Sequence, residues 1–307
     1  MSPKKTKRIK DVFSDRLWSI DTEGMSAVWR RFVQFIKLAR LTVTTFTENR
    51  MGFQCVALSY FVTLAIVPVV ALLFALSGGL GLTEHVTKVA YAVFSDRQDL
   101  VDMVIDKAGN IIDVAKSGTV GLISALMFLW AILWLMFQVE RVFNNVWGIL
   151  KPPRKLYTRV GFYLLALILT PFLVMIFGAG IAYYANITKF MGLDLSGLKI
   201  LPKLIGWTVF YIVAVLTLSV MYKWIPAAKV EYRKALQAAA LAGAVFTLFQ
   251  YLYLNTQVFV SRLNDVYGVI AAFPLFLIYL NFSWQIIIYG AELTYALHNV
   301  DFYKIEE

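Results

Sequence analysis

The chain has 307 residues, of which 60% are hydrophobic and only 16% are charged, and its formal net charge is +10. Soluble globular domains are about 45–50% apolar and about 25% charged, so this composition excludes an ordinary soluble fold. A strongly basic balance also occurs in nucleic-acid-binding proteins, but the positions of the basic residues along this chain indicate a membrane protein instead.

Residues 1–52 form a basic N-terminal segment that ends in an amphipathic helix. The first 24 residues are rich in lysine and arginine and are expected to form a surface arm. In residues 26–47, apolar side chains recur at helical spacing, with basic side chains elsewhere on the helix. This pattern predicts either a helix that lies in the membrane interface or one that docks on the cytoplasmic end of a helix bundle.

Six apolar stretches that are nearly free of charge follow this segment. They cover residues 53–77, 119–139, 160–184, 204–222, 236–258 and 268–293. A bilayer core about 30 Å thick requires about 20 helical residues, and each stretch is about that long. The sequence therefore predicts an all-α polytopic membrane protein, in which residues 53–297 form a six-transmembrane-helix bundle with amphipathic interfacial helices.

Two segments outside these spans complete the predicted domain organisation. The connection 78–118 is too long for a plain loop and is predicted to form two amphipathic helices on the extracytoplasmic side. Asp99, Asp102 and Asp106 share one face of the second helix, which is expected to be a solvated face rather than a metal site. Residues 298–307 are predicted to be a cytoplasmic tail.

The lysine and arginine residues are concentrated on one side of the predicted membrane. That side carries 21 of the 29, and the connections on the other side carry 8. Basic connections are retained in the cytoplasm, so both termini are predicted to be cytoplasmic. The expected location is the cytoplasmic (inner) membrane of a bacterium, with membrane lipids as partners and a homo-oligomer left open.

Polar residues inside the apolar stretches are the candidate functional residues, because a polar group at membrane depth is costly unless it is paired or solvated. They are expected either to bond neighbouring helices or to line a transport path. These residues are Glu292, Asn281, Gln285, Gln250, Gln257, Tyr60 and Thr63.

Two further groups of residues carry structural predictions. Pro68, Pro171 and Pro274 lie inside spans and are candidate helix kinks, because each removes a backbone hydrogen bond. Glu140 and Arg141 are a candidate cytoplasmic ion pair, and Arg141 is also a candidate partner of Glu292.

Residues that carry catalysis are scarce. The chain has only two histidines and one cysteine, Cys55, and it contains no zinc motif, phosphate-binding loop or dinucleotide fingerprint. We therefore expect no enzymatic activity, no metal, no cofactor and no nucleic-acid partner.

Several motifs together resemble the YihY / virulence factor BrkB family of bacterial membrane proteins. The similar segments are Ala57–Phe61 through Pro68, Phe143–Gly148, Tyr222–Pro226, Tyr267–Pro274 and Gly290–Leu293. The resemblance covers most of residues 30–297 and implies a six-span protein of the cytoplasmic membrane. Family members have been linked to serum resistance and envelope function, and a transport role has been suggested. The family once carried a ribonuclease BN label, which no nucleolytic constellation in this sequence supports.

Together these features favour a secondary transporter or flippase for an amphiphilic, lipid-like envelope substrate. Glu292 would contact a proton or a headgroup, and the other polar residues would line the path. The alternative is a non-transporting membrane scaffold for envelope integrity. A cavity that reaches Asn281 would favour transport, whereas a solidly packed core would favour the scaffold.

Overall fold

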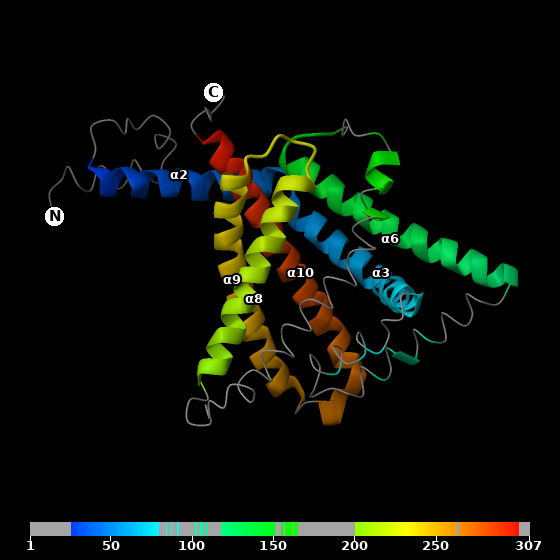
Figure 1. Ribbon diagram of the computed structural model, residues 1–307. Coiled ribbons are helices and arrows are strands. Elements are labelled where there is room, and N and C mark those ends of the chain that lie inside the picture. The colour runs from blue at the N-terminus through cyan, green and yellow to red at the C-terminus, as the bar shows by residue number, and fades with distance from the viewer. Residues whose placement is uncertain are drawn as a thin grey trace, which may run out of the picture. The chain divides into compact units, whose positions relative to one another are not determined.

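The computed structural model describes residues 26–79, 118–150, 200–261 and 264–300, together with isolated positions between 84 and 109 and between 155 and 164. Every secondary-structure element in these parts of the chain is an α-helix (Figure 1). The helices are α2 (Ala27–Glu48), α3 (Met51–Gly79), α6 (Gly118–Val146), α8 (Ile200–Trp224), α9 (Tyr232–Ser261) and α10 (Asn264–Asn299). The predicted all-α class is confirmed.

Five of the six predicted spans fall on these helices. Four helical segments are long and apolar enough to cross a membrane: Leu126–Val146, Gly206–Trp224, Tyr232–Thr256 and Pro274–Asn299. The first predicted span lies on α3, where Met51–Ile66 is apolar but shorter. The third, 160–184, and most of the 78–118 insertion lie outside the described residues, as does Pro171.

The chain divides into two compact units, each of which is described separately. The first unit contains Met1–Ala57, Glu140–Pro152 and Phe210–Glu307, and the second contains Leu58–Val139 and Pro153–Val209. Within the second unit, the Phe137 ring contacts Tyr163 and lies 4.7 Å below the Arg159 guanidinium. Tyr91 donates a hydrogen bond to Asp102, an exposed residue of the predicted acidic face. This hydrogen bond raises the pKa of Tyr91 above its ordinary value.

Helix α10 is the centre of the first unit, because both α9 and α2 pack against it (Figure 1). α2 runs transverse to α8 and α9, across the end of the unit where α9 begins and α10 finishes (Figure 1). The C-terminal half of α2 is docked: Leu41 and Phe46 are buried, and the Phe46 ring stacks on Tyr289 at 3.8 Å. Its N-terminal half is mostly exposed, with Val28 at 80% and Phe35 at 63%, although Val33 is buried. The C-terminal half of this helix thus docks on the helix bundle, whereas its setting in the membrane interface remains a prediction.

The turn between α2 and α3 is tight. Asn49 caps α2: its backbone N–H donates to the Thr45 carbonyl oxygen, and the next backbone N–H, of Arg50, donates to that of Thr47. Arg50 follows with φ of 52°, a left-handed conformation that is uncommon for any residue other than glycine. α3 then begins at Met51, so Asn49 is held at the corner between two helices.

A glycine allows α8, α9 and α10 to meet closely. A Cβ atom on Gly290 would lie 2.0 Å from the Tyr222 hydroxyl oxygen and 2.7 Å from the Ala242 Cβ. The Tyr222 hydroxyl uses this space to donate to the Ile287 carbonyl oxygen at 3.0 Å. Such close packing of small residues is typical of helices in lipid.

Candidate functional site: a buried carboxyl group and an apolar groove

The carboxyl group of Glu292 lies in the interior of the first unit. The residue is 0% exposed, and Asn49 Nδ2 donates to its Oε1 at 3.3 Å. Oε2 is buried and makes no hydrogen bond within the described residues. Thr45 is nearby, but its hydroxyl donates to the Leu41 carbonyl oxygen at 2.9 Å. One carboxyl oxygen is thus available to a proton or a cationic group.

The surroundings of Glu292 follow from local helix geometry. The residue is about 10 Å from the C-terminal end of α10 at a rise of about 1.5 Å per residue. Asn49 reaches it because α2 docks on this end of α10 and stops at the corner before α3. An unpartnered carboxyl oxygen in a buried, membrane-like setting costs several kcal/mol, which makes it a candidate functional group.

Three residues of the predicted polar path form separate hydrogen-bonded pairs instead of one continuous stripe. Gln285 Nε2 donates to Asn281 Oδ1 at 2.6 Å within α10, and the Tyr279 hydroxyl donates to Gln250 Oε1 at 2.9 Å between α10 and α9. The structure therefore brings Asn281 and Gln285 together, and it joins Gln250 to a tyrosine that the sequence did not single out. The side chain of Gln257 lies outside the described residues.

The remaining predicted residues belong to α3 and α6, apart from Pro274 in α10. In the second unit, Tyr60 is 59% exposed, and the Thr63 hydroxyl donates to the Ser59 carbonyl oxygen at 2.8 Å. Glu140 is 1% exposed whereas Arg141 is exposed, because successive helix positions point about 100° apart. Within the described residues, no ion pair joins Arg141 to Glu140 or Glu292. Pro68 and Pro274 lie inside α3 and α10, and kinks at both remain predictions.

A second polar cluster fixes the end of α6 to the loop between α8 and α9. Asn144 Oδ1 accepts from the Ala227 backbone N–H at 2.7 Å. His298 Nε2 accepts from the Glu231 backbone N–H at 3.0 Å, so its proton lies on Nδ1, which faces the Thr294 carbonyl oxygen at 2.8 Å. Trp147 packs edge-on against the His298 ring. Asn144 and Trp147, both in the family-like segment Phe143–Gly148, thus help to join the end of α6 to the α8–α9 loop and to the end of α10.

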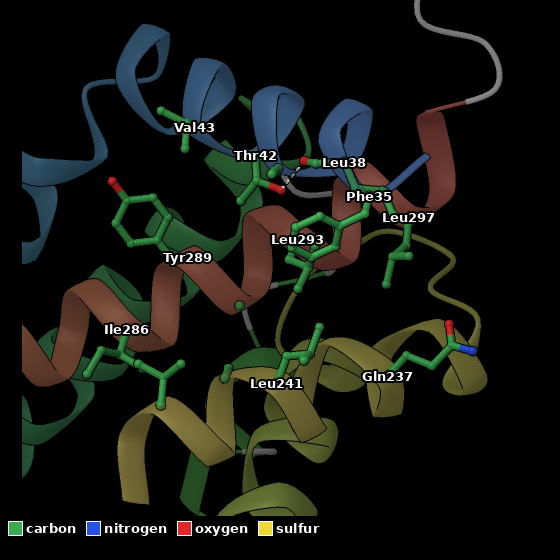
Figure 2. A pocket seen from close by; sticks show the side chains of 14 residues that line it. Phe35, Leu38, Thr42, Val43, Gln237, Leu241, Ile286, Tyr289, Leu293 and Leu297 are labelled. Atoms are coloured by element: carbon green, nitrogen blue, oxygen red, sulfur yellow. Dashed lines mark hydrogen bonds between the residues drawn. The ribbon is translucent and has the colours of Figure 1, made fainter. Parts of the chain in front are cut away.

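An open groove lies between α2, α9 and α10 (Figure 2). Its volume is about 590 Å³. Among its lining side chains, only Thr42, Gln237 and Tyr289 carry polar atoms, and the Thr42 hydroxyl is bonded to the Leu38 carbonyl oxygen at 2.8 Å. The other lining residues are Phe35, Leu38, Ala39, Val43, Leu241, Ala242, Val245, Ile286, Gly290, Leu293 and Leu297. Asn281, Gln285 and Glu292 do not line it, so the groove is separate from the predicted polar path.

A family model, described as virulence factor BrkB, matches residues 42–306. The chain belongs to the virulence factor BrkB family. The match includes the Glu292 site, the Asn144 cluster and most of the groove, and it confirms the resemblance found in the motifs.

Curated relatives are similar along nearly the whole chain. A UPF0761 membrane protein of Haemophilus influenzae is 25% identical over 264 residues, which cover 83% of this chain and 93% of the relative. One from Mannheimia succiniciproducens is 28% identical over 270 residues, with 84% and 88% covered. One from Aggregatibacter aphrophilus is 27% identical over 263 residues, with 83% and 90% covered. No solved structure matches this BrkB-family chain. The names of these relatives support the conclusion that this chain is a membrane protein.

The sequence did not identify three residues of these sites. Asn49, Thr45 and Asn144 are polar residues near helix ends, where they are normally interpreted as caps. The available signal for Asn49 was its place between two predicted helices. Its partner Glu292, however, is 243 positions away and could not be assigned from spacing.

Proposed function

We propose that the chain is a secondary transporter or flippase of the bacterial cytoplasmic membrane that moves an amphiphilic, lipid-like envelope component. Both termini lie in the cytoplasm in this proposal, as the distribution of lysine and arginine predicts. The chain performs no covalent chemistry on the substrate.

The observation that carries the proposal is the buried Glu292 carboxyl group with one oxygen unpartnered within the described residues. Ionisable residues inside membrane spans are rare and mark ion, proton or substrate pathways. The Asn49 amide orients the first oxygen at 3.3 Å, which leaves the second for a proton or for the cationic part of a headgroup. Because Asn49 lies at the corner between α2 and α3, loading this carboxyl group can act on both helices.

The test is lipid translocation in liposomes that contain fluorescent phospholipids, measured by quenching from outside. We expect the native chain to accelerate translocation over protein-free vesicles and Glu292→Gln to reduce the rate roughly tenfold, the effect of about 1.4 kcal/mol on a barrier. Glu48→Gln is the matched control, because it makes the same substitution at an exposed position beside Asn49 and should retain the rate. Equal rates with native protein and with empty vesicles would refute transport of these lipids.

The scaffold is the second candidate, and the Asn281–Gln285 bond favours it. A side chain that bonds its own helix neighbour at 2.6 Å is less available to a substrate. Asn281→Leu separates the two proposals. Slower translocation with an unchanged melting temperature supports a transport path through Asn281, whereas a lower melting temperature with unchanged translocation assigns this pair to packing.

A further inference from the structure

We propose that the groove between α2, α9 and α10 binds one acyl chain of an anionic phospholipid, with the lipid phosphate placed at Arg31 and Lys234. The inference does not rest on transport, because a chain that moves nothing can still hold this lipid.

The shape and chemistry of the groove fit a single acyl chain. Its wall on α10 runs from Ile286 to Leu297, roughly 16 Å at helical rise. Figure 2 shows Phe35, Leu297 and Gln237 gathered at one end and Val43, Tyr289 and Ile286 at the other. Each methylene group removed from water contributes about 0.8 kcal/mol, so an apolar chain gains steadily along this length.

The charges beyond one end of the groove select an anionic headgroup. Arg31 is one turn before Phe35 on α2 and shares the face of Leu38 and Thr42, since steps of four, seven and eleven residues return to nearly the same side of a helix. On α9, Lys234 is similarly placed seven residues before Leu241. Each cation is therefore about one helical turn beyond a lining residue at that end of the groove, Arg31 beyond Phe35 on α2 and Lys234 beyond Gln237 on α9.

On α2 and at the start of α9, acidic side chains only partly offset this positive charge. Glu231 is 3.6 Å from the Lys234 ammonium group and partly neutralises it. Arg31 is exposed, and the acidic residue of α2, Glu48, is at the opposite end of that helix. A phosphate close to both cations is favoured, because each basic residue near an anionic surface gains about 1 kcal/mol.

The transverse setting of α2 makes lipid the fitting occupant. A helix that crosses the ends of membrane-spanning helices lies along the headgroup layer, with its apolar side toward the acyl chains. The exposed Phe35 side chain belongs to that apolar side and also lines the groove. A lipid can therefore place its phosphate at the level of α2 and its acyl chain between α9 and α10.

The experiment is native mass spectrometry of the full chain purified in mixed micelles. The micelles contain equal amounts of phosphatidylglycerol and phosphatidylcholine with identical acyl chains. We expect one retained phosphatidylglycerol per chain, and a phosphatidylglycerol carrying a photoactivatable acyl chain should label peptides from α2, α9 and α10. Arg31→Gln with Lys234→Gln should remove the preference for phosphatidylglycerol.

Two groove-filling variants and one matched control test whether the lipid binds in the groove. Leu241→Trp and Ala39→Trp place bulk in the groove and should reduce retained lipid about tenfold. Leu248→Trp is the control, because Leu241 and Leu248 are 58% and 59% exposed on the same face of α9 but only Leu241 lines the groove. Helical content and melting temperature of each variant verify folding.

Three results would overturn the inference. One is equal lipid retention by Leu241→Trp and Leu248→Trp. A second is equal retention of the two lipids by the native chain. The third is a native dimer that Leu241→Trp converts to monomer with no lipid bound to either, which would assign the groove to a second copy of the chain. Liposome translocation remains a separate readout, so failure here leaves the transport proposal standing.

Discussion

At the scale of single residues, polar side chains in this molecule differ in whether their bonding capacity is filled. Tyr222 and Thr63 donate to backbone carbonyl oxygens of their unit, and Gln250 accepts from Tyr279. Glu292 keeps one buried oxygen without a hydrogen bond in the described part of the chain. Asn144 Nδ2 and Asn281 Nδ2 are also buried there without a hydrogen bond, but they belong to neutral amide groups. Because an unsatisfied buried atom costs more in a charged group, the Glu292 carboxyl group is the more informative case.

The contact at Gly290 leads to a prediction at this scale. Gly290→Ala should lower the free energy of unfolding by about 1–3 kcal/mol, because the new methyl group overlaps the Tyr222 hydroxyl and the Ala242 Cβ. Thermal or denaturant unfolding in detergent measures the loss. Gly206→Ala, where nothing lies within 4 Å, is the control and should leave stability unchanged or raise it. Tyr222→Phe should recover part of the loss in the double variant, and a full loss there would contradict the overlap.

At the scale of elements, the length of the apolar segments predicted the helices well, but it did not predict which side chains form hydrogen bonds with each other. α3, α6, α8, α9 and α10 fall on predicted spans because an apolar run in lipid has to form a helix to satisfy its own backbone. The amphipathic helix at 26–47 is α2, with ends within two residues of those expected.

The sequence did not predict side-chain hydrogen-bond partners where these depend on how distant helices pack together. Asn281 and Gln285 were expected to bond neighbouring helices or to line a path, but their four-residue spacing also lets them form a hydrogen bond with each other. The groove was not foreseen, because it requires α2 to cross two helices that lie far from it in the sequence.

The Asn144 cluster leads to a prediction for the joint between α6 and the α8–α9 loop. Asn144→Ala should reduce stability by about 1–3 kcal/mol, since the part-buried Ala227 N–H loses its acceptor at 2.7 Å. Asn145→Ala removes the same type of side chain from a less buried neighbouring position and should cost less. Melting temperatures of the two variants in one detergent decide the matter, and equal losses would argue against a role for the Ala227 bond.

At the scale of the whole molecule, the membrane determines what the chain can do. Large apolar side chains are exposed on every described helix that is predicted to span, including Leu64, Trp130, Leu216, Leu252 and Ile278. In water such a surface would aggregate, whereas in lipid it is the expected exterior.

The predicted topology can be tested by cysteine labelling, because the one native cysteine, Cys55, is buried. Leu100→Cys and Arg262→Cys should react with an impermeant maleimide added outside intact cells, since the positive-inside distribution places both positions outside. Lys229→Cys, at an exposed position of the α8–α9 loop, should react only after the cells are opened. The reverse labelling pattern would show that the protein has the opposite orientation in the membrane.

The bond between Asn49 and Glu292 also constrains biosynthesis. Its two ends are 243 positions apart, so at about 5–20 residues per second the ribosome adds the acceptor on the order of 12–50 s after the donor. Throughout that interval the corner after α2 lacks its final anchor. A nascent product truncated before α10 lacks Glu292 and can never acquire this anchor.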